Sequence, residues 1–279
     1  MPPAAAYRGR LAPSPTGCLH LGHAQTFWTA QQRARAAGGT LILRNEDLDA
    51  SRFKLEFVEA MLEDLRWFGF DWSEGPDVGG ALAPYNQSER MEYYRAALEQ
   101  LRAGDFVYPC TCSRQDIQAA VTAPHAGDEG VIYPGTCRGN RRPEVGGRKF
   151  TWRLKVPDGE AISFMDGHFG PQKFVAGKDF GDFVVWRSDG VPAYQLACVV
   201  DDAAMGITEV VRGADLLLST ARQILLYRAL KLVIPAFYHC DLRCDDRGQR
   251  LAKRHDALSL RQLRANGENP LILRDFRKP

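Results

Sequence analysis

Apolar residues in the first hundred positions follow the periods of short strands and of amphipathic helices in turn. Strands are predicted over residues 7–12 and 40–43, the second because positions 41–43 form the continuous apolar run of a buried parallel strand. Helical periodicity is expected over residues 24–37, 52–68 and 88–102. Ser88 is expected to cap the third helix at its start, and Gly104 to stop it. The succession predicts right-handed crossovers in a parallel α/β sheet, with a ligand at the carboxyl ends of its strands.

The periodicity is lost between residues 110 and 147, where glycine, proline and arginine accumulate, so an insertion is predicted there. Asp201 and Asp202 are expected to begin the return toward the sheet. Further elements are expected as strands over residues 150–156, 180–187 and 209–212 and as a helix over 219–232. The resulting segments are a first half-domain (1–109), an insertion (110–185), a second half-domain (186–235), and a loop with a helical C-terminal region (236–279). The nucleotide-binding sheet is therefore predicted to be split.

Composition is that of a globular protein without a membrane segment. Lys+Arg 36 against Asp+Glu 34 gives a formal net charge of +2, so any contact with RNA must come from a local basic patch. No stretch approaches the ~18 consecutive apolar residues of a membrane span, and the first residues lack the apolar core of a signal peptide. A cytoplasmic location is expected, where seven cysteines are thiols or metal ligands instead of disulfides.

A polyphosphate site is predicted where the first strand meets the first helix. His20, Gly22 and His23 follow a Pro-Ser-Pro-Thr-Gly turn and precede the helical pattern, where backbone N–H groups and the helix dipole favour anionic oxygens. Taken alone, such an HxGH sequence is more often an ordinary polar turn. A late basic cluster at residues 250–254, which includes Lys253, offers further cations for charge that develops at phosphates.

Five segments occur in an order that extends over nearly the whole chain. They are RLAPSPTGCLHLGH at 10–23, LRNEDLD at 43–49, PYNQS at 84–88, YQLACVVDD at 194–202 and VRGAD at 211–215. Together they resemble the class I aminoacyl-tRNA synthetases of the glutamyl and glutaminyl type. The resemblance implies an α/β, split Rossmann-like parallel-sheet catalytic domain with an inserted zinc-containing segment, acceptor-side strands and a short helical C-terminal region. It also implies a ligase that uses ATP with Mg²⁺. The ATP-site residues that it implies are His20, Gly22, His23, Arg250 and Lys253, of which His20, His23 and Lys253 act in catalysis.

The length of the chain narrows the group of family members that it resembles. The chain continues for only about 25 residues past Lys253, too few for the anticodon-binding domain that family members charging tRNA(Glu) carry there. It therefore resembles the short, stand-alone members of the family. This implies activation of L-glutamate without tRNA, and transfer of glutamate by a monomer to the queuosine base at the wobble position of tRNA(Asp). Three alternatives stay open: a truncated enzyme charging tRNA(Glu), a small-molecule nucleotidyltransferase, and a non-catalytic zinc-containing RNA-binding module.

A glutamate pocket needs cations for two carboxylates and an anion for one ammonium. Arg10 and Arg212 can each fork onto a carboxylate, and Glu46 can accept the ammonium. The resemblance places these residues and Tyr194 at the family's amino-acid positions, together with Leu11, Ala12, Pro13 and Ser14. Taken singly, the arginines are equally well explained as surface ion pairs, Glu46 as a helix-start carboxylate, and Tyr194 as a core aromatic. A pocket of this kind favours glutamate over glutamine, because a neutral amide would leave a guanidinium charge uncompensated.

A zinc site is predicted within the insertion. Cys110, Cys112 and Cys137 are three soft ligands in a stretch without an apolar core, where a tetrahedral Zn²⁺ could drive folding. His125 is the chemically ordinary fourth ligand. The resemblance implies Tyr133 instead, whose phenolate requires the charge of the metal to depress a pKa near 10.

Two departures from the family pattern concern turnover and tRNA use. The family's late Lys-Leu-Ser-Lys signature has Arg250 in place of its first lysine and Ala252 in place of its serine, while Lys253 keeps its position. Cys198 stands where the tRNA-dependent enzymes often have asparagine. Slow adenylation that does not require tRNA is therefore expected.

Overall fold

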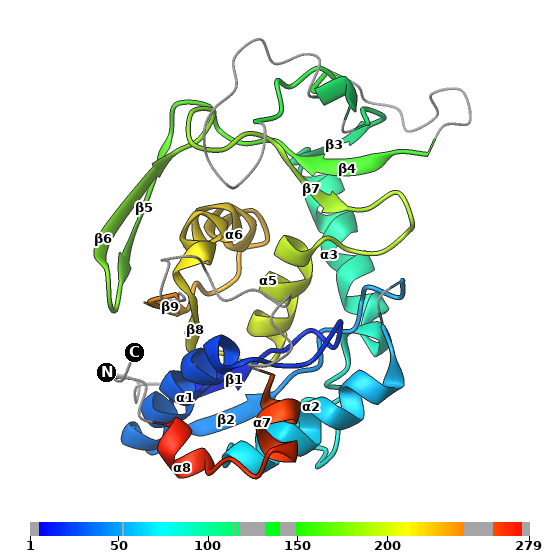
Figure 1. The fold of residues 1–279 in the computed structure, drawn as a ribbon. Coiled ribbons are helices and arrows are strands. Elements are labelled where there is room, and N and C mark those ends of the chain that lie inside the picture. Colours follow the sequence, from blue (N-terminus) through cyan, green and yellow to red (C-terminus); the bar gives the residue numbers. More distant parts are fainter. Residues whose placement is uncertain are drawn as a thin grey trace.

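The parallel strands of the two half-domains meet at the centre of the fold (Figure 1). The computed structural model describes residues 6–51, 53–113, 115–117, 132–139, 149–242 and 259–274. Strand β1 (Arg8–Leu11) pairs parallel with β2 (Thr40–Leu43), and β8 (Glu209–Gly213) pairs parallel with β9 (Ala236–Cys240). The backbone N–H of Thr208 donates to the Arg8 carbonyl oxygen at 2.9 Å, so β1 and β8 lie side by side. The predicted α/β fold with parallel strands is thus confirmed, whereas β9 was not predicted.

Helix α1 (Leu21–Ala36) makes the crossover between β1 and β2 and packs against β1 and β8. It begins three residues before the predicted helix start at residue 24. Helix α2 (Leu55–Phe68) follows β2 and ends at Gly69, whose φ of 90° is the left-handed conformation that glycine adopts most easily.

Helix α3 (Met91–Ala103) ends at Gly104 as predicted, but its predicted start is wrong. Ser88 lies in the short 3-10 helix η1 (Gln87–Glu89), and Arg90 is the N-cap of α3. The Ser88 hydroxyl donates to Asp47 at 2.7 Å, so this serine makes a tertiary contact in place of a helix cap.

Helix α5 (Tyr194–Ala204) contains Asp201 and Asp202, so the prediction that these residues begin the return to the sheet is wrong. Both carboxylates are buried in the helix because they pair with buried arginines: Arg90 Nε lies 2.7 Å from Asp201, and Arg44 Nη1 lies 2.6 Å from Asp202. The short helix η2 (Ala214–Leu216) and helix α6 (Leu217–Ala229) then connect β8 to β9.

An antiparallel hairpin that the sequence did not predict extends the sheet beyond β9. It consists of β5 (Ala161–Asp166) and β6 (Gly170–Val175), and it joins β9 through the parallel pair Asp166 and Phe237. Figure 1 shows the hairpin along one side of the molecule. The strand order on this side is β6-β5-β9-β8.

A separate antiparallel sheet lies at the far end of α3 (Figure 1). It has the order β3-β4-β7, formed by β3 (Val107–Cys110), β4 (Thr151–Leu154) and β7 (Phe183–Trp186). The latter two confirm the strands expected over residues 150–156 and 180–187. The domain boundaries expected within this region stay predictions.

The described C-terminal residues form the short helices α7 (Leu260–Ala265) and α8 (Pro270–Leu273), in agreement with the helical region expected there. Leu260 and Leu263 are buried, and Arg264 pairs with Glu63 and Asp64 of α2. No helix in the described part of the chain is long and apolar enough to cross a bilayer.

Candidate active site

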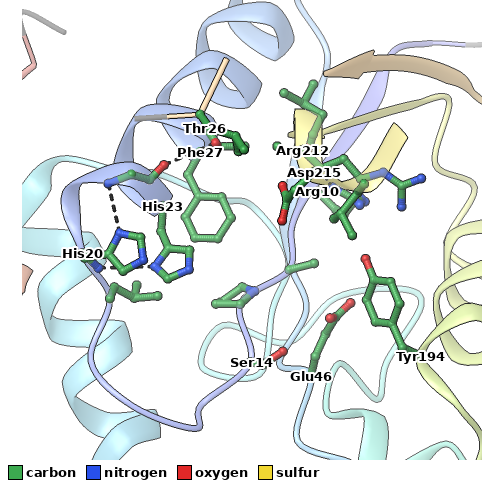
Figure 2. Close-up of a pocket in the computed structure, with 18 of the residues that line it drawn as sticks. Arg10, Ser14, His20, His23, Thr26, Phe27, Glu46, Tyr194, Arg212 and Asp215 are labelled. Carbon is green, nitrogen blue, oxygen red and sulfur yellow. Dashed lines mark hydrogen bonds between the residues drawn. The ribbon is translucent and has the colours of Figure 1, made fainter. Parts of the chain in front are cut away.

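A cavity of about 430 Å³ opens between the carboxyl ends of β1 and β8 and the start of α1 (Figure 2). It lies where a parallel α/β sheet is expected to bind its ligand. Its lining includes the predicted residues Arg10, Ala12, Pro13, Ser14, His20, Gly22, His23, Glu46, Tyr194 and Arg212. Leu11 does not line it: this side chain is fully buried in the core, as expected for alternation along a strand. Arg250 and Lys253 lie outside the described residues.

The two histidines form the N-terminal cap of α1. His20 Nδ1 accepts the Gly22 N–H at 3.1 Å, and His23 Nδ1 accepts the His20 N–H at 3.3 Å. A ring nitrogen that accepts carries no hydrogen, so each neutral ring holds its hydrogen on Nε2, the nitrogen that can donate to an anion. The ring centroids are 3.7 Å apart. The Gly22 N–H is bonded to His20, so the start of the helix offers imidazole N–H donors to an anion in place of this backbone group.

The segment after the late basic cluster is attached to this cap. Leu260 N–H donates to the Leu19 carbonyl at 2.7 Å, and Ser259 forms an isolated antiparallel bridge with His20. Residues 259 and 260, which follow the late basic cluster by five residues in the sequence, therefore contact the HxGH segment.

Arg10 and Arg212 lie on the side of the cavity away from the histidines (Figure 2). Each is 5% exposed, which excludes surface ion pairs as their explanation. Arg10 Nε lies 3.3 Å from Asp202 Oδ1, and its Nη1 donates to the Val211 carbonyl at 3.0 Å.

Arg212 differs from Arg10 in its partners. Its Nη2 donates to Thr220 Oγ1 at 2.7 Å and its Nε to His239 Nε2 at 3.2 Å. Its Nη1 is buried without a hydrogen-bond partner, and within the described ranges no carboxylate lies at ion-pair distance from Arg212. A buried guanidinium in a cavity wall, with no carboxylate at ion-pair distance in the described ranges, suits an anionic ligand.

Glu46 faces the same end of the cavity from the loop after β2 and is 8% exposed, so it is not a helix-start carboxylate. Its Oε1 accepts from Arg44 Nη2 at 3.0 Å, and the Cys198 thiol lies 3.5 Å from the same oxygen. Burial raises the pKa of Glu46 although Arg44 and Arg10 oppose the shift. An ammonium group bound in the cavity would favour the ionised carboxylate again.

Arg44 was missed by sequence reasoning, although it is fully buried directly beneath the site. It binds both Glu46 and Asp202, and Asp202 in turn binds Arg10. Burial raises the pKa of Asp202, but Arg44 and Arg10 outweigh this effect and leave the pKa lowered. The sequence offered one signal for Arg44 as a site residue: it stands between an apolar strand and Glu46, the carboxylate predicted to bind the ligand.

Tyr194 is the first residue of α5, and its ring faces the cavity (Figure 2). Its side chain is 41% exposed, so Tyr194 is not a core aromatic. The cavity thus has one end lined by guanidinium, carboxylate and phenol groups and another lined by two imidazoles. This arrangement suits a small zwitterion with an extra carboxylate next to a polyphosphate.

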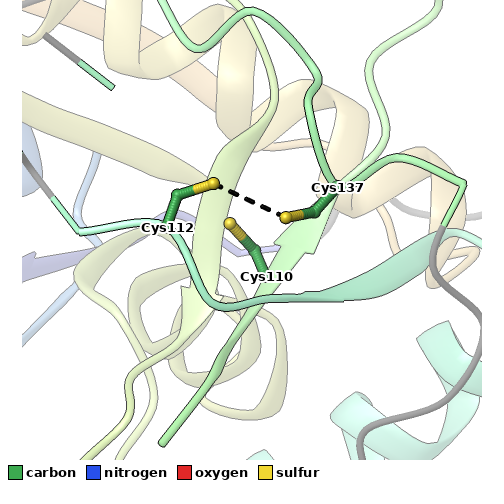
Figure 3. A group of neighbouring side chains, drawn as sticks. All are labelled: Cys110, Cys112 and Cys137. Carbon is green, nitrogen blue, oxygen red and sulfur yellow. Dashed lines mark hydrogen bonds between the residues drawn. The ribbon is translucent and has the colours of Figure 1, made fainter. Parts of the chain in front are cut away.

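Three thiols come together at the end of β3, as Figure 3 shows. The sulfur atoms of Cys110, Cys112 and Cys137 all lie within 4.8 Å of one another. The Tyr133 hydroxyl lies 3.4 Å from the sulfurs of Cys110 and Cys112 and accepts the Cys137 N–H at 2.9 Å. His125 lies outside the described residues.

The fold and the cavity are those of a nucleotide-binding catalytic domain of the synthetase type. The family model of the class I tRNA synthetases (E and Q), catalytic domain, matches residues 6–277, and the chain belongs to this family. The resemblance found in the sequence is confirmed, and the chain is an enzyme of the ligase class.

Two relatives carry a more particular name. The chain is 53% identical to the glutamyl-Q tRNA(Asp) synthetase of Symbiobacterium thermophilum, covering 94% of this chain and 82% of the relative. It is 51% identical to the protein of the same name from Nitratidesulfovibrio vulgaris, covering 93% and 82%.

A solved structure of a glutamate tRNA ligase from Elizabethkingia meningosepticum, in complex with its amino acid, has the same fold. The TM-score is 0.78 at 32% identity, over 89% of this chain and 52% of the ligase. The chain therefore spans about half the length of that enzyme.

Proposed function

We propose that this chain activates L-glutamate with ATP to form glutamyl-adenylate and transfers the glutamyl group to a tRNA. The observation that carries the proposal is Arg212, which lines the cavity beside Arg10 and whose buried Nη1 has no hydrogen-bond partner. A substrate carboxylate compensates the charge of Arg212, and Glu46 across the cavity accepts the substrate ammonium. Glutamate carries both groups, whereas glutamine would leave the guanidinium uncompensated at a cost of several kcal/mol, about a hundredfold or more in discrimination.

Orientation of the substrate follows from the separation of the two ends of the cavity. The side-chain carboxylate of glutamate lies with Arg10 and Arg212, so its α-carboxylate points toward the histidines. There it attacks the α-phosphorus of ATP in line, and pyrophosphate leaves. His20 and His23 donate through Nε2 to phosphate oxygens, Lys253 adds a positive charge, and Mg²⁺ accompanies the nucleotide.

The acceptor is the queuosine base at the wobble position of tRNA(Asp). The name shared by two relatives above 50% identity supports this choice. A hydroxyl of the acceptor attacks the carbonyl carbon of the mixed anhydride, an ester forms and AMP leaves, so no side-chain nucleophile is needed. Activation of glutamate proceeds without tRNA, which separates this function from that of a truncated enzyme charging tRNA(Glu).

Amino-acid-dependent exchange of pyrophosphate into ATP tests the first step. We expect exchange with glutamate in the absence of RNA, and at most about a hundredth of that rate with glutamine. An absolute requirement for tRNA would favour the truncated enzyme. ATP binding without any exchange would favour the non-catalytic RNA-binding module.

Transfer of radiolabelled glutamate tests the second step. The matched substrates are tRNA(Asp) that contains queuosine, tRNA(Asp) that lacks it, and tRNA(Glu). We expect label only on the first, and label on tRNA(Glu) would contradict the proposed acceptor.

The cysteine cluster is proposed as a structural zinc site with Tyr133 as fourth ligand. The donors fit: with Zn–S bonds of about 2.3 Å, a tetrahedron needs sulfur atoms about 3.8 Å apart, and the sulfurs of Cys112 and Cys137 are 3.5 Å apart. The guanidinium of Arg153 lies over the Tyr133 ring, 4.1 Å from its centroid, where a positive charge favours a phenolate. The cluster joins the loop of Cys137 to β3, and Arg138, through Asp182, attaches the same loop to the adjoining strands.

A further inference from the structure

Behind Arg212 lies a chain of buried polar groups from three neighbouring strands. In the order β5-β9-β8, Asp166, His239 and Arg212 follow one another, and Arg212 and His239 are direct partners in the register of β8 and β9. All three side chains are at most 5% exposed. From this geometry we infer that Asp166 and His239 are positioning residues that fix the guanidinium of Arg212 for the side-chain carboxylate of the substrate. The inference rests on the proposed glutamate site.

Hydrogen-bond chemistry determines the direction of the chain. His239 Nε2 lies 3.0 Å from Thr220 Oγ1 and 3.2 Å from Arg212 Nε. A guanidinium has donors only, so toward Arg212 this nitrogen accepts with its lone pair, and the Thr220 hydroxyl can donate to the same nitrogen. The ring hydrogen then lies on Nδ1, which donates to Asp166 Oδ2 at 2.6 Å. A protonated imidazole would place an N–H against the N–H of Arg212. Burial and the Arg212 charge agree with the neutral ring, since they lower the pKa of His239 to about 4 although Asp166 opposes the shift.

Asp166 is itself held by the backbone. It accepts the N–H groups of His168 at 3.0 Å and Phe169 at 2.9 Å in the hairpin turn, and the His239 N–H at 3.1 Å. Burial raises the pKa of Asp166, but these N–H groups and the imidazole outweigh burial and leave the pKa lowered. The carboxylate is thus ionised and cannot rotate without loss of several hydrogen bonds.

The guanidinium is fixed on two of its three nitrogens. Nε is bound by His239 and Nη2 by Thr220, so the plane of the group is set and Nη1 remains for a ligand. Arg10 receives its orientation differently, from a carboxylate and a carbonyl. The Asp166–His239 pair therefore orients Arg212 without placing a carboxylate at ion-pair distance from it, and Nη1 keeps its hydrogen-bonding capacity for an acidic substrate.

Variants of His239 test this role in glutamate-dependent pyrophosphate exchange, with separate Michaelis constants for glutamate and ATP. His239→Leu removes the acceptor, and we expect the KM for glutamate to rise roughly 10- to 100-fold, as for loss of a buried hydrogen bond to a charged group. The KM for ATP should change less than about threefold. His239→Gln can place its amide oxygen near the position of Nε2. We therefore expect its KM for glutamate to rise, on a logarithmic scale, by no more than half of the rise in His239→Leu. Asp166→Asn keeps an acceptor for Nδ1 but loses the charge, and should raise the KM for glutamate by about three- to tenfold.

The matched control is Asp182→Asn. Asp182 is also a buried carboxylate that binds a backbone N–H and side chains, but it lies by the cysteine cluster and does not line the cavity. The Asp182→Asn substitution should lower the melting temperature without changing the KM for glutamate. If His239→Leu fails to fold, Asp166→Asn, with its expected three- to tenfold rise in the KM for glutamate, carries the test.

Three results would overturn the inference. One is a glutamate KM within twofold of wild type in folded His239→Leu or, if that variant does not fold, in Asp166→Asn. Another is a rise of both Michaelis constants together, as a purely structural role would give. The third is a wild-type protein that neither exchanges pyrophosphate with glutamate nor binds glutamate in calorimetry. Only this last result also overturns the proposed function.

Discussion

Replacement of Arg212 by methionine tests the charge on which the proposed specificity depends. Methionine has nearly the length of arginine and no charge, so Arg212→Met removes one partner of a buried ion pair that forms when glutamate binds. Arg212 is 5% exposed and has no carboxylate at ion-pair distance in the described ranges, whereas Arg10, the other arginine proposed to face the substrate carboxylate, lies 3.3 Å from Asp202. Loss of one partner of a buried pair costs about 3–5 kcal/mol, which is roughly 150- to 4,000-fold in kcat/KM.

The assay is pyrophosphate exchange with glutamate and with glutamine over a range of concentrations. We expect kcat/KM for glutamate to fall by the amount above, and kcat/KM for glutamine to fall less than about tenfold, since an amide gains little from the charge. The control is Arg153→Met. Arg153 is buried to a similar degree as Arg212, at 8% exposed, but it lies beside the cysteine cluster. A fall with glutamate smaller than tenfold, or equal falls with both amino acids, would refute the reasoning.

Three further predictions concern other parts of the molecule. Lys253→Ala should reduce pyrophosphate exchange at least tenfold, ~1.4 kcal/mol of transition-state stabilisation, and an unchanged rate would remove the role of Lys253 in ATP binding. Cys112→Ser should lower the zinc content, measured by elemental analysis, from about one ion per chain to less than half, whereas equal metal content in both proteins would exclude Cys112 as a ligand. Burial raises the pKa of Asp64 to about 6, so its contribution to stability is present below about pH 4 and lost as pH rises through 6. Asp64→Asn resembles the protonated acid, so its melting temperature relative to wild type should rise between about pH 4.5 and 7.5, and a difference that stays constant would contradict the shift.

The sequence predicted most clearly the elements whose local pattern is apolar or helical. Strand β2 was found because a strand covered on both faces is continuously apolar, whereas β1 and β8 each contain charged residues within a short strand. The hairpin of β5 and β6 was missed because much of it is exposed, and its residues lie in a stretch regarded as an insertion. Strand β9 was missed because it is short and contains His239, a polar residue buried only through its partners.

Asp201 and Asp202 show a limit of the same kind. Charged residues are rarely buried, so their pattern indicates the end of a buried segment. Their burial depends on Arg44 and Arg90, which are more than a hundred residues away in the sequence. Local periodicity contains no information on such partners.

The candidate site shows the same difference between residues that local sequence identifies and residues that only distant contacts identify. Residues that line the cavity could be predicted because they lie at the ends of predicted strands and match a family motif. Leu11 was included only through its place in that motif, and the structure buries its side chain in the core. The groups that hold the lining side chains in place, such as Arg44, Thr220 and Asp166, became recognisable only from the three-dimensional contacts.

The most direct test of the central claim is a crystal structure of the protein with a non-hydrolysable analogue of glutamyl-adenylate. The account predicts the side-chain carboxylate of the analogue at about 3 Å from Arg212 Nη1, its ammonium at Glu46, and its phosphate on the side of His20 and His23. An analogue bound outside this cavity, or bound with its side-chain carboxylate toward the histidines, would contradict it.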